Sequence, residues 1–299
     1  MKIAIYAQQY SESYRKVLAD LHANFQSGDT IYIEQHFLEE LKTKLPEYEN
    51  VRSFSKFSDL DPSFDVMLTI GGDGTILRAI TFVRNLNIPI LGINVGRLGF
   101  LAMAQKDEIK HTLQLLRSKA YNISERSVIE IITSNERQAI SDINFALNEI
   151  TVTRKNTASM ITINTELNGE FLTSYWADGL IISTPTGSTG YSLSCGGPVI
   201  TPESKNFVIT PIAPHNLNAR PLVISDDTEI KLTVSGREKK YFVSLDSRIE
   251  TLSNKTAIIV RKADFSIKMI RLENESFIKT LRNKLLWGED NRNRPNNPQ

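Results

Sequence analysis

The sequence contains only one cysteine, Cys195, and its four histidines show no metal-ligand spacing. One cysteine cannot form a disulfide within the chain, which is typical of proteins from a reducing compartment. The chain begins MKIAIYAQQY, without the long apolar run of a signal peptide, and no stretch approaches the ~20 apolar residues of a membrane-spanning helix. We therefore expect a cytoplasmic protein with no membrane partner.

An excess of charge of one sign is also missing. The formal net charge is +1, so no global field favours nucleic acid or an anionic membrane as a partner. Hydrophobic residues make up 40% of the 299 residues, which is enough for one large core or two ordinary ones. The composition predicts a globular protein that does not bind nucleic acid.

The first part of the chain alternates short apolar runs with helical patterns. Val66–Ile70 is a continuous apolar run, as expected of a strand that is covered on both faces. Such alternation predicts an α/β domain, with helices packed on a parallel sheet. We expect strands at residues 3–7, 66–70 and 89–93, and helices at 11–25, 34–45, 76–86 and 109–116.

The residue pattern changes after about residue 121, where short runs rich in β-branched residues follow one another. Asn168 and Gly169 lie between two such runs and predict a hairpin. The second domain is therefore expected to be mostly β. We predict an α/β domain at 1–120, a β-rich domain at 121–275, a helix at 276–288 that packs back on the first domain, and a disordered tail at 289–299.

The stretch TIGGDGTILRA joins the apolar run at 66–70 to the next helix. Its glycines let backbone N–H groups approach a pyrophosphate, and the helix N-terminus adds partial positive charge. Asp73 would repel phosphate, which favours a role as proton acceptor for an attacking hydroxyl or a place beside a metal ion. The alternative is an ordinary turn. We expect the backbone here not to depend on the charge of Asp73.

Two further polar clusters follow. Asn148 and Glu149 precede a β-branched run, where an amide and an acid suit an adenine edge and a ribose diol, although a polar strand start would look the same. Asp178 precedes the apolar run that opens into TPTGSTGYSLSCGGP at 184–198, a loop rich in hydroxyls and glycine. Tyr191 offers one aromatic face for a base. A solvated linker is the alternative, but long loops of this kind in compact domains tend to be functional.

Together these motifs resemble the NAD kinase family. The resemblance depends on GGDGT at 71–75, NVGRLGFL at 94–101, NE at 148–149, ADG at 177–179, the loop at 184–198 and PHNLNARPL at 214–222. GGDGT alone is shared with diacylglycerol-type lipid kinases and is similar to the 6-phosphofructokinase loop. The hydroxyl-rich loop with NE upstream is more specific.

The resemblance implies an α/β domain followed by a β-rich, dinucleotide-binding domain, and transfer of the γ-phosphoryl of ATP to the 2′-hydroxyl of the adenosine ribose of NAD. It also implies a divalent metal ion, Mg²⁺, ATP as the phosphoryl donor, and a homo-oligomer, either a dimer or a tetramer. Asp73 would be the proton acceptor. The implied cofactor-binding residues are Asp73, Gly74, Arg78, Asn148, Glu149, Asp178, Thr189, Gly190, Tyr191, Ser192, Leu193, Ser194 and Ala213.

Three residues depart from the family's pattern. Gly190 and Cys195 stand where alanine is common, and Arg248 stands where glutamine is common. Both loop replacements are small, so we expect the loop to be retained. Two other functions stay open at this point: a lipid or sugar kinase with the same glycine loop, and a dinucleotide-binding regulator without catalysis.

Overall fold

The computed structural model describes residues 1–96, 99–102, 104–134, 140, 142–156, 159–272 and 276–286. The chain forms two compact units, one made of Met1–Ser124 with Lys268–Gln299 and the other of Glu125–Ile267. It passes from the first unit to the second within strand β7 (Asn122–Thr133) and returns within β18 (Ile258–Arg271). Residues 287–288 of the predicted last helix and the predicted tail at 289–299 lie outside the described residues.

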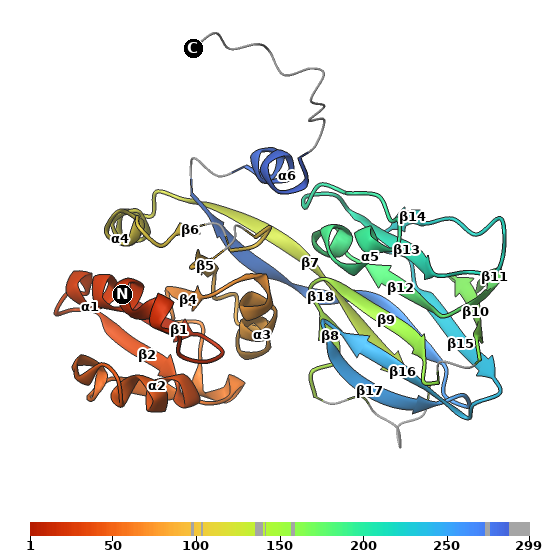
Figure 1. Ribbon diagram of the computed structural model, residues 1–299, viewed down its shortest axis with the longest axis horizontal. Helices are drawn as coiled ribbons and strands as arrows, with labels where there is room; N and C mark the ends of the chain where they lie inside the picture. Colours follow the sequence, from red (N-terminus) through yellow and green to blue (C-terminus); the bar gives the residue numbers. More distant parts are fainter. Residues whose placement is uncertain are drawn as a thin grey trace, which may run out of the picture. The chain divides into compact units, whose positions relative to one another are not determined.

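The first unit is built on a parallel sheet (Figure 1). The strand order is β18-β5-β4-β1-β2-β3, with β6 beside β5. Its strands, apart from β18, are β1 (Lys2–Tyr6), β2 (Thr30–Glu34), β3 (Arg52–Phe54), β4 (Val66–Ile70), β5 (Ile90–Asn94) and β6 (Ala104–Gln105). Its helices are α1 (Arg15–Asn24), α2 (Gln35–Lys42), α3 (Asp73–Val83), α4 (Ile109–Ser118) and α6 (Phe277–Leu285), with short 3-10 turns at Glu12–Tyr14, Pro46–Tyr48 and Phe57–Asp59.

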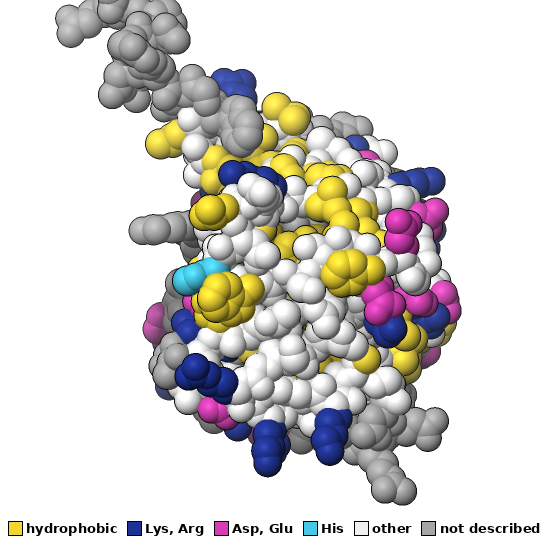
Figure 2. Space-filling view, turned by 90° about the vertical axis from the view of Figure 1, so that its right-hand side faces the viewer, with side chains coloured by type: hydrophobic (Ala, Val, Ile, Leu, Met, Phe, Trp, Pro, Cys, Tyr) yellow, Lys and Arg dark blue, Asp and Glu magenta, His cyan; other side chains and the backbone are white. Residues whose placement is uncertain are grey.

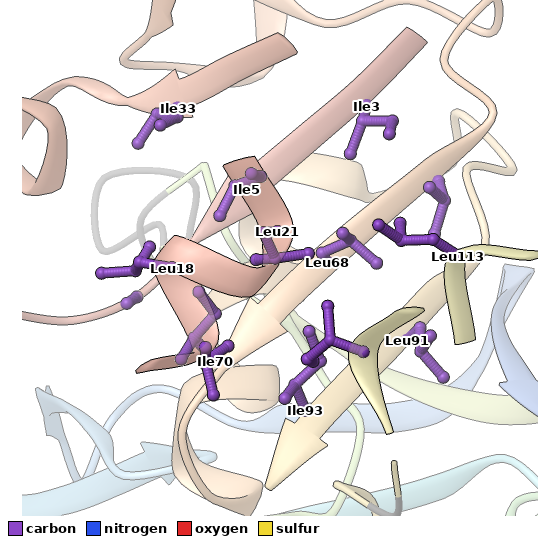
Figure 3. Packing of buried hydrophobic residues seen from close by; sticks show 14 of the residues in the cluster. Ile3, Ile5, Leu18, Leu21, Ile33, Leu68, Ile70, Leu91, Ile93 and Leu113 are labelled. Atoms are coloured by element: carbon purple, nitrogen blue, oxygen red, sulfur yellow. The ribbon is translucent and has the colours of Figure 1, made fainter. Parts of the chain in front are cut away.

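Alternate residues of the central strands form one core of this unit (Figure 3). Successive side chains of a strand point to opposite faces, so every second apolar residue meets the same helices. On one face, buried residues of α1, α2 and α4 pack against these strands. The members shown include Ile3, Ile5, Leu18, Leu21, Ile33, Leu68, Ile70, Leu91, Ile93 and Leu113.

The predicted α/β pattern is confirmed, with two local differences. We did not predict β2 and β3, and Ile33 is the only buried residue of β2. Helix α3 begins at Asp73, three residues before the predicted start, so Asp73 and Gly74 belong to its first turn and not to a loop. Arg84, in a left-handed conformation with φ 44°, ends the helix.

The second unit consists of two packed sheets of mostly antiparallel strands, as predicted for a β-rich domain. One sheet has the order β14-β13-β12-β9-β16-β17, and the other contains β11-β10-β15-β18 with β7 and β8. Buried apolar side chains from both sheets form a single core. The strands are β8 (Phe145–Ala146), β9 (Glu149–Arg154), β10 (Ile161–Leu167), β11 (Glu170–Ala177), β12 (Gly179–Ser183), β13 (Asn206–Ile212), β14 (Leu222–Ser225), β15 (Ile230–Gly236), β16 (Lys240–Leu245) and β17 (Arg248–Ser253).

The hairpin predicted at Asn168 and Gly169 joins β10 to β11. Both residues have positive φ, 51° and 83°, as a tight hairpin turn requires. Strands β11 and β14 end their sheets and carry exposed apolar side chains, and Figure 2 shows apolar side chains gathered on the face it presents. The exposed set is Phe171, Leu172, Trp176, Leu222 and Val223, with Leu217 in the preceding loop.

None of the helices in the described parts of the chain is long and apolar enough to cross a membrane.

Candidate functional site

Asp73 holds a neighbouring piece of backbone. Its carboxylate accepts three N–H groups: Oδ2 from Phe100 at 2.8 Å, and Oδ1 from Leu101 at 3.0 Å and Ala102 at 3.1 Å. The expectation that the backbone does not depend on this charge was therefore wrong. A buried N–H group needs an acceptor, and three of them share this one side chain.

Gly99 precedes these three donors and makes the close approach possible. A Cβ atom at this position would lie 1.9 Å from Oδ1 of Asp73. Gly74 accepts a hydrogen bond at its carbonyl from the side-chain amide of Gln8, at the end of β1. Arg78 is exposed on α3. Burial raises the pKa of Tyr6, and the positive charge of Arg78 lowers that pKa and so partly cancels the effect. The glycine turn, Asp73, Gly74 and Arg78 thus form one group at the carboxyl ends of the parallel strands, where α/β sheets bind ligands.

Asn148 and Glu149 lie in the second unit, at the start of β9, and their backbone is fixed by Asp246. The Asp246 carboxylate accepts the N–H groups of Leu147 at 2.6 Å, Asn148 at 2.8 Å and Glu149 at 3.2 Å. Asp246 follows β16 in the tight turn to β17, with φ 46°. We did not identify Asp246 from the sequence, although the short DS turn between two β runs is a signal for a hairpin there.

The side chains of this half-buried pair each carry a buried oxygen with unused hydrogen-bonding capacity. Among the described residues, Oδ1 of Asn148 and Oε2 of Glu149 have no hydrogen-bond partner. Burial, followed by the charge of Asp246, raises the pKa of Glu149 to about 8, while the backbone N–H of Tyr191 opposes the shift. Unsatisfied buried oxygens are costly, so this pair is suited to a ligand that supplies donors.

The hydroxyl-rich loop lies next to Asn148 and Glu149 because β12 pairs with β9. Ser183, the last residue of β12, is opposite Glu149 in an antiparallel register. The chain then forms a 3-10 turn at Thr186–Thr189 and a short helix, α5, at Tyr191–Ser194. The backbone N–H and the hydroxyl of Thr184 donate to the carbonyls of Asn148 and Leu147, at 2.9 Å and 2.5 Å. The loop is thereby tied to the strand that carries the amide–acid pair.

Several hydroxyl groups of the loop form hydrogen bonds that stabilise the loop. Ser188 donates to the carbonyl of Pro185 at 2.7 Å, and its hydroxyl accepts the N–H of Ile200 at 2.9 Å. Ser192 is fully buried, and its hydroxyl shares a hydrogen bond of 2.8 Å with the hydroxyl of Thr210. These two serines therefore support the loop from beneath.

The remaining predicted residues of the loop lie nearer its surface. Thr189 donates from its hydroxyl to the carbonyl of Thr186 at 3.2 Å, and Ser194 is exposed while Leu193 is half-buried. The position of a Cβ at Gly190 is 3.2 Å from Oε2 of Glu149, so an alanine there would press on that carboxyl group. The loop thus brings its surface residues over the acid of the NE pair.

Tyr191 presents an aromatic ring to solvent beside this pair, with 44% of the residue exposed. Burial of its hydroxyl and the neighbouring Cys195 thiol raise the pKa of Tyr191, and the charges of Asp178 and Glu149 act in the same direction. Asp178 precedes β12 and forms an ion pair with Arg154 at 2.9 Å. Its backbone N–H donates to the carbonyl of Ile212 at 3.0 Å, which places Ala213 beside it.

Arg248 has a structural function in this unit. Its guanidinium donates to the carbonyls of Leu245 at 3.0 Å and Ile143 at 2.9 Å, and also to that of Phe145. Burial raises the pKa of Asp246, and the positive charge of Arg248 partly cancels this effect. Arginine at this position therefore stabilises the turn that holds Asn148 and Glu149.

The described residues do not form a metal centre of their own. Within the described ranges, no group of three or more His, Cys, Asp or Glu side chains is placed to hold an ion. Both oxygens of Asp73 already accept N–H groups. Magnesium usually retains water and binds through substrate phosphates with one or two carboxylates.

Family models match both parts of the chain. The ATP-NAD kinase N-terminal domain matches residues 7–121, and the ATP-NAD kinase C-terminal domain matches residues 147–272. The chain is 56% identical to the NAD kinase of Flavobacterium johnsoniae over 294 residues, which cover 98% of this chain and 100% of that protein.

Two solved structures are similar in fold. Yeast NADH kinase in complex with NADH has a TM-score of 0.88 at 23% identity, covering 99% of this chain and 90% of that chain. An NAD kinase from Archaeoglobus fulgidus in complex with ATP has a TM-score of 0.69 at 26% identity, covering 95% and 97%. The first likeness concerns the fold alone. With both family models matched and more than half of the residues identical to a curated relative, the chain belongs to the NAD kinase family of phosphotransferases.

Proposed function

We propose that this protein phosphorylates NAD with ATP, and that its β-rich unit binds the adenosine part of NAD while its α/β unit supplies the glycine turn with Asp73. Membership of the NAD kinase family supports the reaction. One observation supports the assignment of the adenosine site. Asn148 and Glu149 each have a buried oxygen without a hydrogen-bond partner among the described residues, and the exposed ring of Tyr191 lies beside them.

Each of these groups has a partner on an adenosine. The adenine amino group is a donor for Oδ1 of Asn148, and a ribose hydroxyl is a donor for Oε2 of Glu149. The ring of Tyr191 offers a stacking surface, worth roughly 1–3 kcal/mol per base in comparable sites. Thr189, Gly190, Leu193 and Ser194 surround the ring as the wall of the site, Ser192 supports them from beneath, and Asp178 and Ala213 face the rest of the dinucleotide.

The transfer itself exchanges one phosphorus–oxygen bond for another. The 2′-oxygen of the adenosine ribose forms a bond to the γ-phosphorus, and the bond from that phosphorus to the bridging oxygen of ADP breaks. The hydroxyl proton passes to Asp73, at Oδ2, which accepts one N–H group where Oδ1 accepts two. Gly74 and Arg78 line the phosphates, because a helix N-terminus and a guanidinium both stabilise negative charge. A magnesium ion bound to ATP would supply neutralisation of the charge on the phosphates.

A homo-oligomer, a dimer or a tetramer, is part of this proposal. Exposed apolar side chains lie on β11 and β14, among them Phe171 at 62% exposure, and monomers seldom leave large apolar patches in water. Light scattering on Phe171→Ser and on the unchanged protein tests it, since a monomer in both cases would contradict the assembly.

A cytoplasmic location, consistent with the single free Cys195, is tested by cell fractionation.

One experiment tests the function as a whole. Purified protein incubated with NAD, ATP and Mg²⁺ should form NADP and ADP in equal amounts. Binding of NAD without NADP formation would indicate a dinucleotide-binding regulator instead. Phosphorylation of a lipid or a sugar in place of NAD would overturn the substrate assignment.

A further inference from the structure

The carboxylate of Asp73 and residues 99–102 fix each other. Two N–H groups bind Oδ1 and one binds Oδ2, so both oxygens are directed by the same short segment. Gly99 leaves no side chain between the segment and the carboxylate, because a Cβ there would overlap Oδ1. The direction of the carboxylate is therefore determined by where this segment lies.

The segment is in turn anchored by the side chain of Phe100. This residue is 8% exposed, and its ring packs against Phe277 with ring centroids 6.1 Å apart. The ammonium group of Lys284 lies 4.9 Å from the centroid of the same ring. Phe277 and Lys284 are seven residues apart on α6, a spacing of about two turns, so one side of this helix covers Phe100.

We propose that α6 positions the carboxylate of Asp73, with Phe277 as the positioning residue that acts through Phe100 and the N–H groups of residues 100–102. The inference rests on the function proposed above for Asp73. Its physical basis is that a proton acceptor must be held closely in place, since a misplacement of about 1 Å can cost as much as 10²-fold in rate. Neither Phe277 nor Lys284 needs to touch a substrate for this effect.

The first test compares three variants of α6. Phe277→Ala removes the ring that packs on Phe100 and should lower kcat about tenfold, within the range known for misplaced catalytic groups, with KM for NAD nearly unchanged. Phe277→Leu retains apolar contact and should restore most of the rate. Ile278→Ala is the matched control, because Ile278 is the next residue on α6 and is 57% exposed. An unchanged kcat in Phe277→Ala would overturn the inference.

The second test asks whether the effect passes through Asp73. Phe277→Ala is combined with Asp73→Asn, and kcat is measured for both single variants and the double variant. If Phe277 acts through Asp73, the second substitution should add little to the loss already caused by Asp73→Asn. A full tenfold additional loss would show that Phe277 affects the enzyme by another route. Near wild-type turnover in Asp73→Asn alone would overturn the function proposed for Asp73 and this inference with it.

The third test does not depend on activity. Hydrogen exchange of the amides of Phe100, Leu101 and Ala102 reports whether their bonds to Asp73 persist. Exchange should accelerate at these amides in Phe277→Ala and stay unchanged in Ile278→Ala. Equal protection in both variants would show that α6 does not hold the segment, even if NADP formation were slower in Phe277→Ala.

Discussion

Asp246 and Glu149 are joined by two hydrogen bonds in opposite directions: the Asp246 carboxylate accepts the N–H of Glu149 at 3.2 Å, and the backbone N–H of Asp246 donates to the carbonyl of Glu149 at 3.2 Å. Burial, followed by the charge of the same carboxylate, raises the pKa of the Glu149 side chain. One turn residue thus fixes the position of the acid proposed to bind the ribose and adds to the effect of burial on its pKa.

Asp246→Asn should destabilise the protein and weaken NAD binding. The amide cannot accept from all three N–H groups of residues 147–149, and a buried donor left without a partner costs about 1–3 kcal/mol. Thermal unfolding and calorimetric titration with NAD measure the two effects. Ser247→Gly is the control, since Ser247 is exposed in the same turn with φ 70°, which glycine adopts easily. An unchanged melting temperature in Asp246→Asn would contradict the positioning function.

NAD affinity should depend on pH through Glu149. Its pKa of about 8 in the free protein means that the carboxyl is mostly protonated at neutral pH. A ribose hydroxyl that donates to this group favours the carboxylate, so binding releases a proton. The affinity should then rise with pH, by at most about tenfold per unit, and level off above the free pKa.

Calorimetry at pH values on either side of 8 checks this dependence. Glu149→Gln should bind NAD more weakly and lose the pH dependence, because glutamine does not titrate in this range. Glu170→Gln, an exposed change in the β10–β11 hairpin, should retain it. The assignment of Glu149 is refuted if the glutamine variant binds NAD as tightly as the original protein.

The same pKa makes the stability of the free protein fall with rising pH. The folded pKa of Glu149 lies above the ordinary value of 4.5, so its contribution is fully present below 4.5 and is lost as the pH rises through about 8. Glu149→Gln should reduce this loss, because no proton has to leave a buried site. Melting temperatures measured across that window without NAD test the sign, and a steeper fall in the variant would contradict it.

Tyr191→Ala should weaken NAD binding about tenfold or more, because stacking of a base on an aromatic ring contributes roughly 1–3 kcal/mol. Tyr191→Phe keeps the ring and should have a mild effect, limited to the contact of the hydroxyl with Cys195. Calorimetric titration with NAD distinguishes the two variants. Equal affinity in the alanine variant and the original protein would exclude stacking.

Asp73→Asn should make NADP at least about a hundredfold more slowly, in line with the loss of a general base. It should also melt at a lower temperature, because the new amide group faces one of the N–H groups that the carboxylate now accepts. Single-turnover kinetics at saturating NAD measure the rate, and binding of NAD should persist.

A magnesium titration of the same variant separates two functions of the acid. If excess Mg²⁺ restores most of the rate, Asp73 mainly anchors the metal–ATP complex. If turnover stays low at saturating Mg²⁺ and NAD, the proton-acceptor function stands. Near wild-type turnover in Asp73→Asn at the Mg²⁺ concentration used for the unchanged protein would leave Asp73 with only its structural function.

Local patterns in the sequence were enough to predict the α/β unit, the β-rich unit and the hairpin at Asn168. Each depends on interactions between residues close in the chain: the apolar run of Val66–Ile70, helical spacing, and a turn that needs positive φ. The glycine turn after β4 was predicted to lie at the carboxyl end of a buried strand for the same reason, and it does.

Only the tertiary structure decided how the polar residues are held. Asp73 meets donors 27 to 29 residues away, and Asp246 meets donors 97 to 99 residues away. In both cases the partners are backbone N–H groups, which every residue except proline has, so no pattern of side chains in the sequence marks them. The raised pKa of Glu149 has the same origin, because burial and the approach of Asp246 exist only once β9 and the turn after β16 are brought together.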